Sequence, residues 1–119
     1  MMYPFVNWKA WEQQKGFLSE PFDTNIIINE NNIKFNVDIV NGQKTGYFLD
    51  QQDNRRAIQH IVKDADVLGA FCYTGSFEIS AGFYGAKSVL GLDISQNAID
   101  MCNKNAALNG LEKFAALNV

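Results

Sequence analysis

The residues best suited to chemistry are a glycine-bearing turn and an aspartate, each of which follows a short apolar run. The first run, which includes Val67 and Phe71, leads into the turn CYTGS at residues 72–76. The second run, at residues 89–92, ends on Asp93. Apolar strand, turn, helix, apolar strand and acid is the pattern of a nucleotide-binding βαβ unit. In such a unit, N–H groups of the turn approach the ligand and the acid accepts hydrogen bonds from two ribose hydroxyls.

The number of glycines in the turn separates two kinds of ligand. A dinucleotide fingerprint has three glycines and this turn has one, which disfavours NAD. Fewer glycines leave less room for a pyrophosphate against the backbone. A ligand with an adenosine and no phosphates needs less room, so the pattern favours S-adenosylmethionine.

The composition is that of one globular domain, since the 119 residues are 47% hydrophobic and 19% charged. We expect neither a membrane span nor a secretory signal, because no long apolar run and no basic leader occur. Cys72 and Cys102 fit no metal-ligand spacing and no disulfide framework, which predicts free thiols, no metal and a cytoplasmic location. The net charge of −3 disfavours strong RNA binding by this chain alone.

The chain divides into three predicted parts. Residues 1–24 form an aromatic-bearing arm with a short helix near 7–15, whose aromatic side chains pack over the sheet or on a partner. Residues 25–49 are predicted to form a β-hairpin or meander. A short strand at 26–28 leads through a turn at 30–32 into a half-buried strand at 33–39, and Asn41-Gly42 then turns the chain into a returning strand at 43–48. Residues 50–119 are predicted to form a partial Rossmann-like α/β domain.

Besides the helix of the βαβ unit, two helices and a last strand are expected in this third part. The first helix begins at Asp50 or Asp53 as N-cap and ends near residue 64, with an apolar face made by Ile58, Ile61 and Val62. The second, at 96–108, begins at the N-cap Ser95 and ends at Asn109-Gly110, and residues 114–119 begin a third strand. His60, the only histidine, has no visible partner and is interpreted as structural or solvent-facing.

Two arginines lie in the first turn of the first predicted helix. Positive charge at a helix N-terminus opposes the helix dipole, so Arg55 and Arg56 indicate an anionic partner. A salt bridge to a nearby carboxylate is the more common explanation.

Four segments, in this order and spacing, resemble a known family: GQKTGYFLDQQDNRR at 42–56, FCYTGSF at 71–77, GLDIS at 91–95 and NKNAALNGL at 103–111. They are similar to the class I S-adenosylmethionine-dependent methyltransferases that modify cytosine C5 of large-subunit (23S) ribosomal RNA. The resemblance covers about residues 15–119. It implies the first half of a sheet with strand order 3-2-1-4-5-7-6, preceded here by the hairpin.

The resemblance also implies roles for particular residues. Asp93 corresponds to the acid that holds the ribose of S-adenosylmethionine, and the cofactor pocket draws on three segments. The implied cofactor residues are Lys44, Thr45, Phe48, Asp50 and Gln51, then Phe71, Cys72, Tyr73, Thr74 and Gly75, and finally Asp93 and Ile94. Arg55 and Arg56 match the basic end of the first segment and are implied as weak RNA contacts.

The sequence departs from the family at several points. Gly69 stands where the family has an acid, a loss that would weaken cofactor binding, and Ser76 replaces a second glycine. The family's RNA-binding domain is expected before Met1, and its Asp-Pro-Pro motif and catalytic cysteine after Val119. C5 methylation requires thiolate attack on C6. Cys72 belongs to the cofactor loop and Cys102 to a helix, so we assign no catalytic residue in this chain.

Half a sheet predicts an open edge at residues 67–71, from Val67 to Phe71, and an open edge favours a homodimer or a complementing chain. Three functional interpretations stay open. The chain is the cofactor-binding half of a methyltransferase, or a non-catalytic association fragment that has lost cofactor binding. The third, an NAD-dependent enzyme, is disfavoured by the turn.

Overall fold

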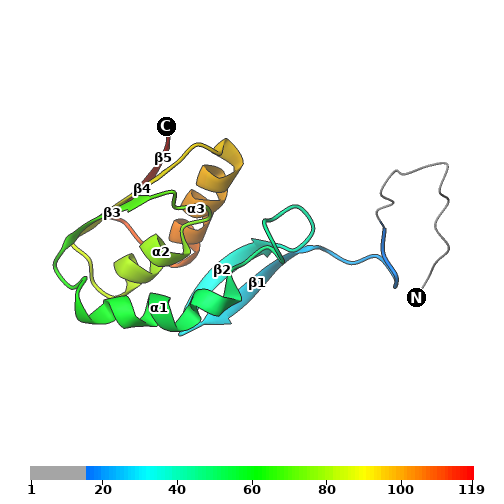
Figure 1. Cartoon of the computed structure of the whole chain (residues 1–119), viewed down its shortest axis with the longest axis horizontal. Helices are drawn as coiled ribbons and strands as arrows, with labels where there is room; N and C mark the ends of the chain where they lie inside the picture. Colours follow the sequence, from blue (N-terminus) through cyan, green and yellow to red (C-terminus); the bar gives the residue numbers. More distant parts are fainter. Residues whose placement is uncertain (1–15) are drawn as a thin grey trace.

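A computed structural model describes residues 16–119 of the chain (Figure 1). The helix predicted near 7–15, and with it Trp8 and Trp11, lies outside the described residues. The elements are β1 (Asn25–Glu30), β2 (Ile33–Asp38), the 3-10 turn η1 (Leu49–Gln51), α1 (Gln52–Ala57), the 3-10 turn η2 (Ile58–His60), β3 (Asp66–Ala70), α2 (Ser76–Phe83), β4 (Ser88–Asp93), α3 (Gln96–Leu108) and β5 (Phe114–Asn118).

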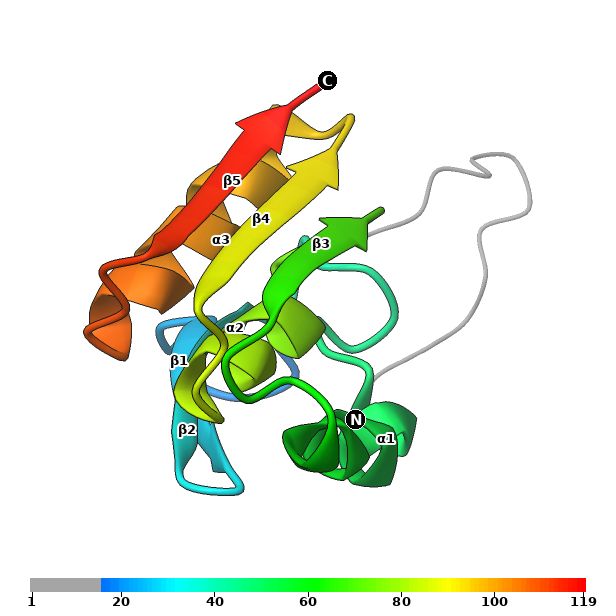
Figure 2. The same cartoon turned by 90° about the vertical axis from the view of Figure 1, so that its left-hand side faces the viewer.

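These elements form three layers. The parallel sheet has the strand order β3-β4-β5, and α2 and α3 pack on one of its faces (Figure 2). The β1-β2 hairpin packs on the other side of the same two helices, which therefore lie between the sheet and the hairpin (Figure 1). The predicted βαβ unit, the helix at 96–108 and the third strand are confirmed, and so is the α/β class with its leading hairpin.

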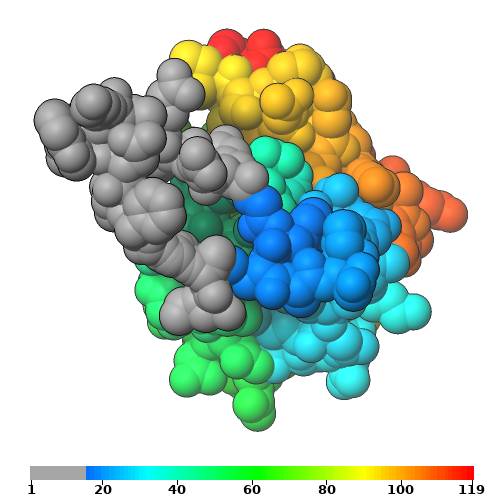
Figure 3. Space-filling model, turned by 90° about the vertical axis from the view of Figure 1, so that its right-hand side faces the viewer, coloured from blue at the N-terminus to red at the C-terminus, as the bar shows by residue number. Residues whose placement is uncertain are grey.

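Alternation along β2 explains how the hairpin attaches. Ile33, Phe35 and Val37 are at most 4% exposed and belong to the core that includes Ile79 of α2 and Ala106 of α3. The residues between them point away from this core, as expected for a strand with one buried face. Phe17 and Phe22, in contrast, pack edge-to-face on each other and stay 44% and 54% exposed. Their segment, blue in Figure 3, lies at the surface next to the hairpin. The expected packing of aromatic side chains over the parallel sheet is therefore not found for these two residues.

The predicted turn at residues 30–32 and the strands on either side of it are confirmed, whereas the second predicted turn, at Asn41-Gly42, does not make a hairpin. β1 and β2 pair from Asn25↔Asp38 to Glu30↔Ile33, so the chain reverses at Asn31 and Asn32, whose φ angles are 55° and 68°. Two residues with positive φ make the tight turn that matches the twist of a two-stranded ribbon. No returning strand forms at residues 43–48.

A compact loop replaces that strand. The Asp38 carboxylate accepts hydrogen bonds from the N–H groups of Val40 and Asn41, and Gly42 N–H donates to the Asp38 carbonyl. These local bonds turn the backbone away from β2 directly after its last residue. Residues 39–48 therefore leave the hairpin and reach toward the carboxyl ends of β3 and β4, where Gln43 meets Tyr73.

The helix predicted between residues 50 and 64 is shorter and broken. α1 has only six residues between two 3-10 turns, and its N-cap is Gln51, without a side-chain capping bond, so neither Asp50 nor Asp53 caps it. Because the helix ends before residue 61, Ile61 does not continue the apolar face and is 77% exposed. Val62 is buried as predicted.

A buried ion pair joins the hairpin to α1. Arg55 and Glu30 are 1% and 6% exposed, and the guanidinium contacts both carboxylate oxygens, at 2.6 and 2.9 Å. The same guanidinium donates to the Phe48 carbonyl at 2.8 Å and stacks 4.5 Å from the ring centroid of Tyr47, whose hydroxyl donates to Glu30. The salt-bridge explanation of Arg55 therefore holds, and a side chain that is 1% exposed offers RNA no surface in this structure. Arg56 is exposed.

One face of the sheet is open. Val89 and Gly91 of β4 are buried under the helices, whereas the alternate residues Leu90 and Leu92 point to the other face. On that face lie Leu68, 66% exposed, and Leu117, 53% exposed, together with Leu90 and Leu92. Among residues 16–119, β3 has one neighbouring strand, which leaves its other edge unpaired. None of the helices described is long and apolar enough to cross a membrane.

Replacing Arg55 with alanine should destabilise the fold by about 3–5 kcal/mol, because it leaves the Glu30 carboxylate buried without its charge partner. Urea unfolding followed by circular dichroism measures this loss. The neighbouring Arg56→Ala is the matched control, and its exposed position predicts a change within about 0.5 kcal/mol. Equal effects of the two substitutions would show that the ion pair does not hold the hairpin to α1.

Candidate cofactor site at the carboxyl ends of β3 and β4

The loop after β3 is bent into an unusual backbone conformation. Phe71 and Tyr73 have φ angles of 58° and 51°, and Gly75 has φ of 82°. Positive φ is costly for residues other than glycine, so the surroundings must hold this loop in place. Cys72 N–H donates to the Leu92 carbonyl at 3.0 Å, and Gly75 N–H donates to the Cys72 carbonyl at 2.8 Å. A side chain at Gly75 would collide with the Cys102 sulfur, which explains the single glycine.

Asp93 ends β4 and joins it to this loop. One carboxylate oxygen accepts a hydrogen bond from Tyr73 N–H and the other from Ser95 N–H, both at 2.9 Å. Each carboxylate oxygen has two lone pairs, so both retain capacity for a ligand hydroxyl. Because β3 and β4 are parallel neighbours, Asp93 and residues 71–75 meet at the same edge.

Two large apolar side chains are exposed to solvent at this edge of the sheet. Phe71, directly after β3, is 91% exposed, and Ile94, directly after β4, is 83% exposed. They flank the loop and the acid, one after each strand. Exposed apolar surface beside hydrogen-bonding groups is typical of a site for a flat heterocycle.

The segment at residues 43–48 reaches the same place through Tyr73. Gln43 N–H donates to the Tyr73 hydroxyl at 2.8 Å, and the Phe48 ring meets the Tyr73 ring edge-to-face at 5.7 Å. The Lys44 ammonium lies 4.9 Å from the centroid of the Phe48 ring. The structure thus brings Lys44 and Phe48 to residues 71–75. The Arg55 guanidinium holds Phe48 in place by donating a hydrogen bond to the backbone carbonyl of Phe48.

The other implied residues of that segment lie further along. Thr45 is exposed, and its hydroxyl donates to the Tyr47 carbonyl. Asp50 and Gln51 lie in η1, where their side chains bond to each other at 3.4 Å. Among the hydrogen bonds of residues 16–119, none joins Asp50 or Gln51 to the loop at 71–75. Their role in cofactor binding stays a prediction.

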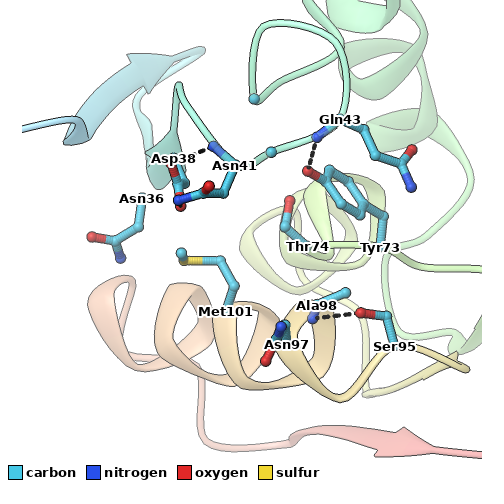
Figure 4. Close-up of a pocket in the computed structure, with 12 residues that line it drawn as sticks. Asn36, Asp38, Asn41, Gln43, Tyr73, Thr74, Ser95, Asn97, Ala98 and Met101 are labelled. Atoms are coloured by element: carbon cyan, nitrogen blue, oxygen red, sulfur yellow. Dashed lines mark hydrogen bonds between the residues drawn. The ribbon is translucent and has the colours of Figure 1, made fainter. Parts of the chain in front are cut away.

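A cavity of about 480 Å³ lies behind the loop and was not predicted from the sequence (Figure 4). Figure 4 shows Tyr73 and Thr74 on one side, Asp38 and Asn41 on another, and Met101 of α3 below them. Tyr73 and Thr74 are the only implied cofactor residues in its lining. Its polar groups come from the hairpin, the loop at 39–46 and α3, and no sequence spacing links these segments.

A buried carboxylate beneath the loop was also missed. Glu78 lies in the first turn of α2, is 6% exposed, and its carboxylate fills the space where a side chain at Gly69 would begin. Burial raises the pKa of Glu78 to about 7, and the negative charge of Asp93 adds to the increase. The two sequence features involved are an acid in the first turn of α2 and a glycine in β3. Nothing in the sequence shows that they face each other, so the buried carboxylate becomes evident only in the structure.

The two cysteines are buried and free. Burial raises the pKa of Cys72 to about 11, and it also raises the pKa of Cys102. Thiols with such pKa values stay protonated at neutral pH and are poor nucleophiles. This supports the interpretation that neither cysteine is catalytic.

The model of one protein family, described as S-adenosylmethionine-dependent methyltransferase, matches residues 9–116. The chain belongs to this family. Within residues 16–119, no three His, Cys, Asp or Glu side chains gather where they could hold a metal ion.

Curated proteins with similar sequences are also named as methyltransferases. The chain is 51% identical over 87 residues to a ribosomal RNA large subunit methyltransferase I of Aeromonas salmonicida, covering 73% of this chain and 22% of the relative. It is 46% identical over 111 residues to the protein of the same name from Aliivibrio fischeri, covering 90% of this chain and 28% of the relative. The chain therefore spans about a quarter of the length of these relatives.

Several solved structures share the fold of this chain. An S-adenosylmethionine-dependent methyltransferase from Agrobacterium tumefaciens matches 96% of this chain and 38% of its own, with a TM-score of 0.76 and 23% identity. A tRNA (uracil-54, C5)-methyltransferase of Pyrococcus abyssi, in complex with S-adenosyl-L-homocysteine, matches 81% of this chain and 24% of its own, with a TM-score of 0.66 and 18% identity. At these identities the likeness concerns the fold, and the Rossmann-like prediction is confirmed.

The raised pKa of Glu78 predicts how stability depends on pH. The folded-state pKa of about 7 lies above the ordinary value of 4.5, so the folded chain binds more protons than the unfolded chain between these pH values. The free energy of unfolding should therefore fall as the pH rises from 4.5 to 7. The shift corresponds to a loss of about 3 kcal/mol.

Urea unfolding at pH 5 and pH 7.5 measures this dependence. Glu78→Gln is the control, because an amide of nearly the same shape does not titrate, and its stability should vary less over this range. The same pH dependence in both proteins would assign the effect to other groups.

Proposed function

We propose that this chain is the S-adenosylmethionine-binding part of a methyltransferase that acts on cytosine C5 of large-subunit (23S) ribosomal RNA. The observation that carries the proposal is Asp93, which ends β4 with both carboxylate oxygens hydrogen-bonded to neighbouring backbone and with lone pairs to spare. An acid in this position, beside a turn that follows the adjacent parallel strand, suits the two hydroxyls of a ribose.

The residues around Asp93 suit the rest of the cofactor. Ile94 and Phe71 offer exposed apolar surface for the adenine ring, and the loop from Phe71 to Gly75 places backbone groups along the strand ends. Lys44 supplies a cation near the loop for the carboxylate of the amino-acid end. When bound, S-adenosylmethionine supplies the methyl group.

The substrate is proposed from the family resemblance and from the relatives. Those relatives are named ribosomal RNA large subunit methyltransferase I, and the four sequence segments resemble enzymes that modify cytosine C5. We propose Arg56 as an RNA contact, because it is exposed, and we exclude Arg55, which is buried against Glu30. A reaction on ribosomal RNA and two free thiols favour a cytoplasmic location.

We further propose that these 119 residues alone bind the cofactor but transfer no methyl group. Methylation at C5 needs a thiolate that attacks C6. Cys72 and Cys102 are both buried with raised pKa values, and the 119 residues contain no Asp-Pro-Pro sequence.

A second candidate is a non-catalytic association fragment, and one observation favours it. The open face of the sheet carries Leu68, Leu90, Leu92 and Leu117, and β3 has an unpaired edge. We propose that this face and edge pair with a second copy or with a complementing chain. An NAD-dependent activity is disfavoured by the single glycine of the loop.

Titration with S-adenosylhomocysteine tests the proposed cofactor site. The wild-type chain should bind, and Asp93→Ala should weaken binding at least about 10-fold, because it removes the charged acceptor for two hydroxyls. Asp100→Ala is the matched control, since Asp100 is an exposed acid on α3, and it should bind like the wild type.

The outcomes separate the alternatives. Binding of NAD in place of S-adenosylhomocysteine would favour a dehydrogenase. A folded chain that binds neither ligand would favour the association fragment. Near-ultraviolet circular dichroism of the Asp93→Ala protein shows whether its loop keeps the wild-type structure.

Sedimentation velocity tests association through the open face. The wild-type chain should form dimers that Leu68→Asp converts to monomers, because the substitution places a charge in the middle of an apolar face. Ile61→Asp changes an equally exposed apolar residue away from the sheet and should leave the dimer intact. A monomeric wild-type chain, or dimers in all three proteins, would contradict the proposed surface.

A further inference from the structure

Glu78 is a buried carboxylate without a structural explanation in its own surroundings. It is 6% exposed, and its Oε2 atom is fully buried with no hydrogen-bond partner. A buried acceptor without a partner costs free energy, and an ionised one costs more. The rest of the fold satisfies nearly all its buried polar side chains, since Arg55 is the only other described residue with such an atom. An orphaned carboxylate of this kind calls for an explanation, and a bound ligand group supplies one.

Two glycines make room for this side chain. A Cβ atom at Gly69 of β3 would overlap the Glu78 carboxylate, and a Cβ atom at Gly91 of β4 would lie 3.7 Å from the Glu78 Cγ. Gly69 and Gly91 are paired in the sheet, so the carboxylate lies over adjacent positions of the two strands that end at the candidate site. Position 69 is also where the family resemblance places an acid. The carboxylate is therefore present at this position, but it comes from the helix and not from the strand.

The groups that face Glu78 carry no positive charge. Those that influence it are the thiols of Cys72 in the loop and Cys102 on α3, and the carboxylate of Asp93 at the end of β4. Among the ion pairs of residues 16–119, Glu78 takes part in none. The strand ends beside it thus hold two carboxylates with no cation between them, and such a site favours a cationic ligand group.

We propose that Glu78 supplies, from α2, the carboxylate that stabilises the cationic amino-acid end of the bound cofactor. The inference rests on the proposed function. Asp93, on β4, takes the ribose, so the part of the ligand beyond the ribose extends along the strand ends to the loop after the adjacent β3. This part carries the ammonium group. Glu78 lies directly below that loop, and in a low-dielectric interior its charge acts over several ångströms without direct contact.

Binding of two ligands tests the inference. S-adenosylhomocysteine contains the amino-acid end, and 5′-methylthioadenosine has the same adenosine without it. Glu78→Gln should weaken S-adenosylhomocysteine about 10-fold, as expected for the loss of one charge interaction, and leave 5′-methylthioadenosine within about twofold of wild type. Glu112→Gln, at an exposed glutamate far along the chain from α2, is the matched control and should change neither affinity.

Moving the carboxylate back to the strand gives a second, independent test. In Gly69→Asp/Glu78→Ala the acid occupies the same space from β3, and it should bind S-adenosylhomocysteine within about threefold of wild type. Gly69→Asp alone forces two carboxylates together and should lose binding or stability. If the double variant does not fold, as judged by thermal unfolding, the Glu78→Gln protein and the two ligands decide the question.

The results distinguish this inference from the proposed function. Equal loss of both ligands in Glu78→Gln would make Glu78 a purely structural residue and overturn the inference, as would unchanged binding of both. In either case the proposed function stands if Asp93→Ala loses binding and the wild type retains it. A wild-type chain that binds neither ligand would overturn both.

Discussion

The ion pair between Arg55 and Glu30 holds together the parts of the structure that surround the candidate site. Glu30 is the last residue of β1, Arg55 lies in α1, and the guanidinium also holds the backbone of Phe48. These contacts support the hydrogen bond from Gln43 and the ring contact of Phe48 by which residues 43–48 meet Tyr73, because that segment has no regular secondary structure of its own. The pair is well buried and hydrogen-bonded on several sides, which is the condition under which a buried charge is tolerated.

The central part of the fold was predictable because its signals are local. Apolar runs, a small-residue turn, the N-cap Ser95 and the terminating Gly110 each specify their own element, and the structure agrees at each of them. The hairpin was predictable in its first turn, at residues 31 and 32, because alternation along the following strand buries Ile33, Phe35 and Val37 together. The second asparagine-containing turn, at Asn41-Gly42, misled the prediction, because Asp38 binds the backbone there and turns the chain away from β2.

The candidate site was only partly predictable, for a different reason. Asp93 and the loop at 71–75 follow from the rule that parallel strands end at the same edge, so the sequence alone places them together. The positions of the Arg55 and Glu78 side chains depend on residues distant in the sequence. Arg55 is held by the Glu30 carboxylate on β1, and Glu78 fits because Gly69 on β3 has no side chain. Pairings of this kind arise only after the layers have packed, and propensity or periodicity carries no information about them.

The arrangement in three layers limits how other molecules can approach. α2 and α3 are covered by the sheet on one side and by the hairpin on the other, so the free stripe of α3 is almost entirely polar. Two further surfaces are open to other molecules: the carboxyl edge of the strands, which is rich in hydrogen-bonding groups, and the flat leucine face of the sheet. The two surfaces lie on different sides of the strands, so a protein could dock on the leucine face while the strand ends remain accessible to a small molecule.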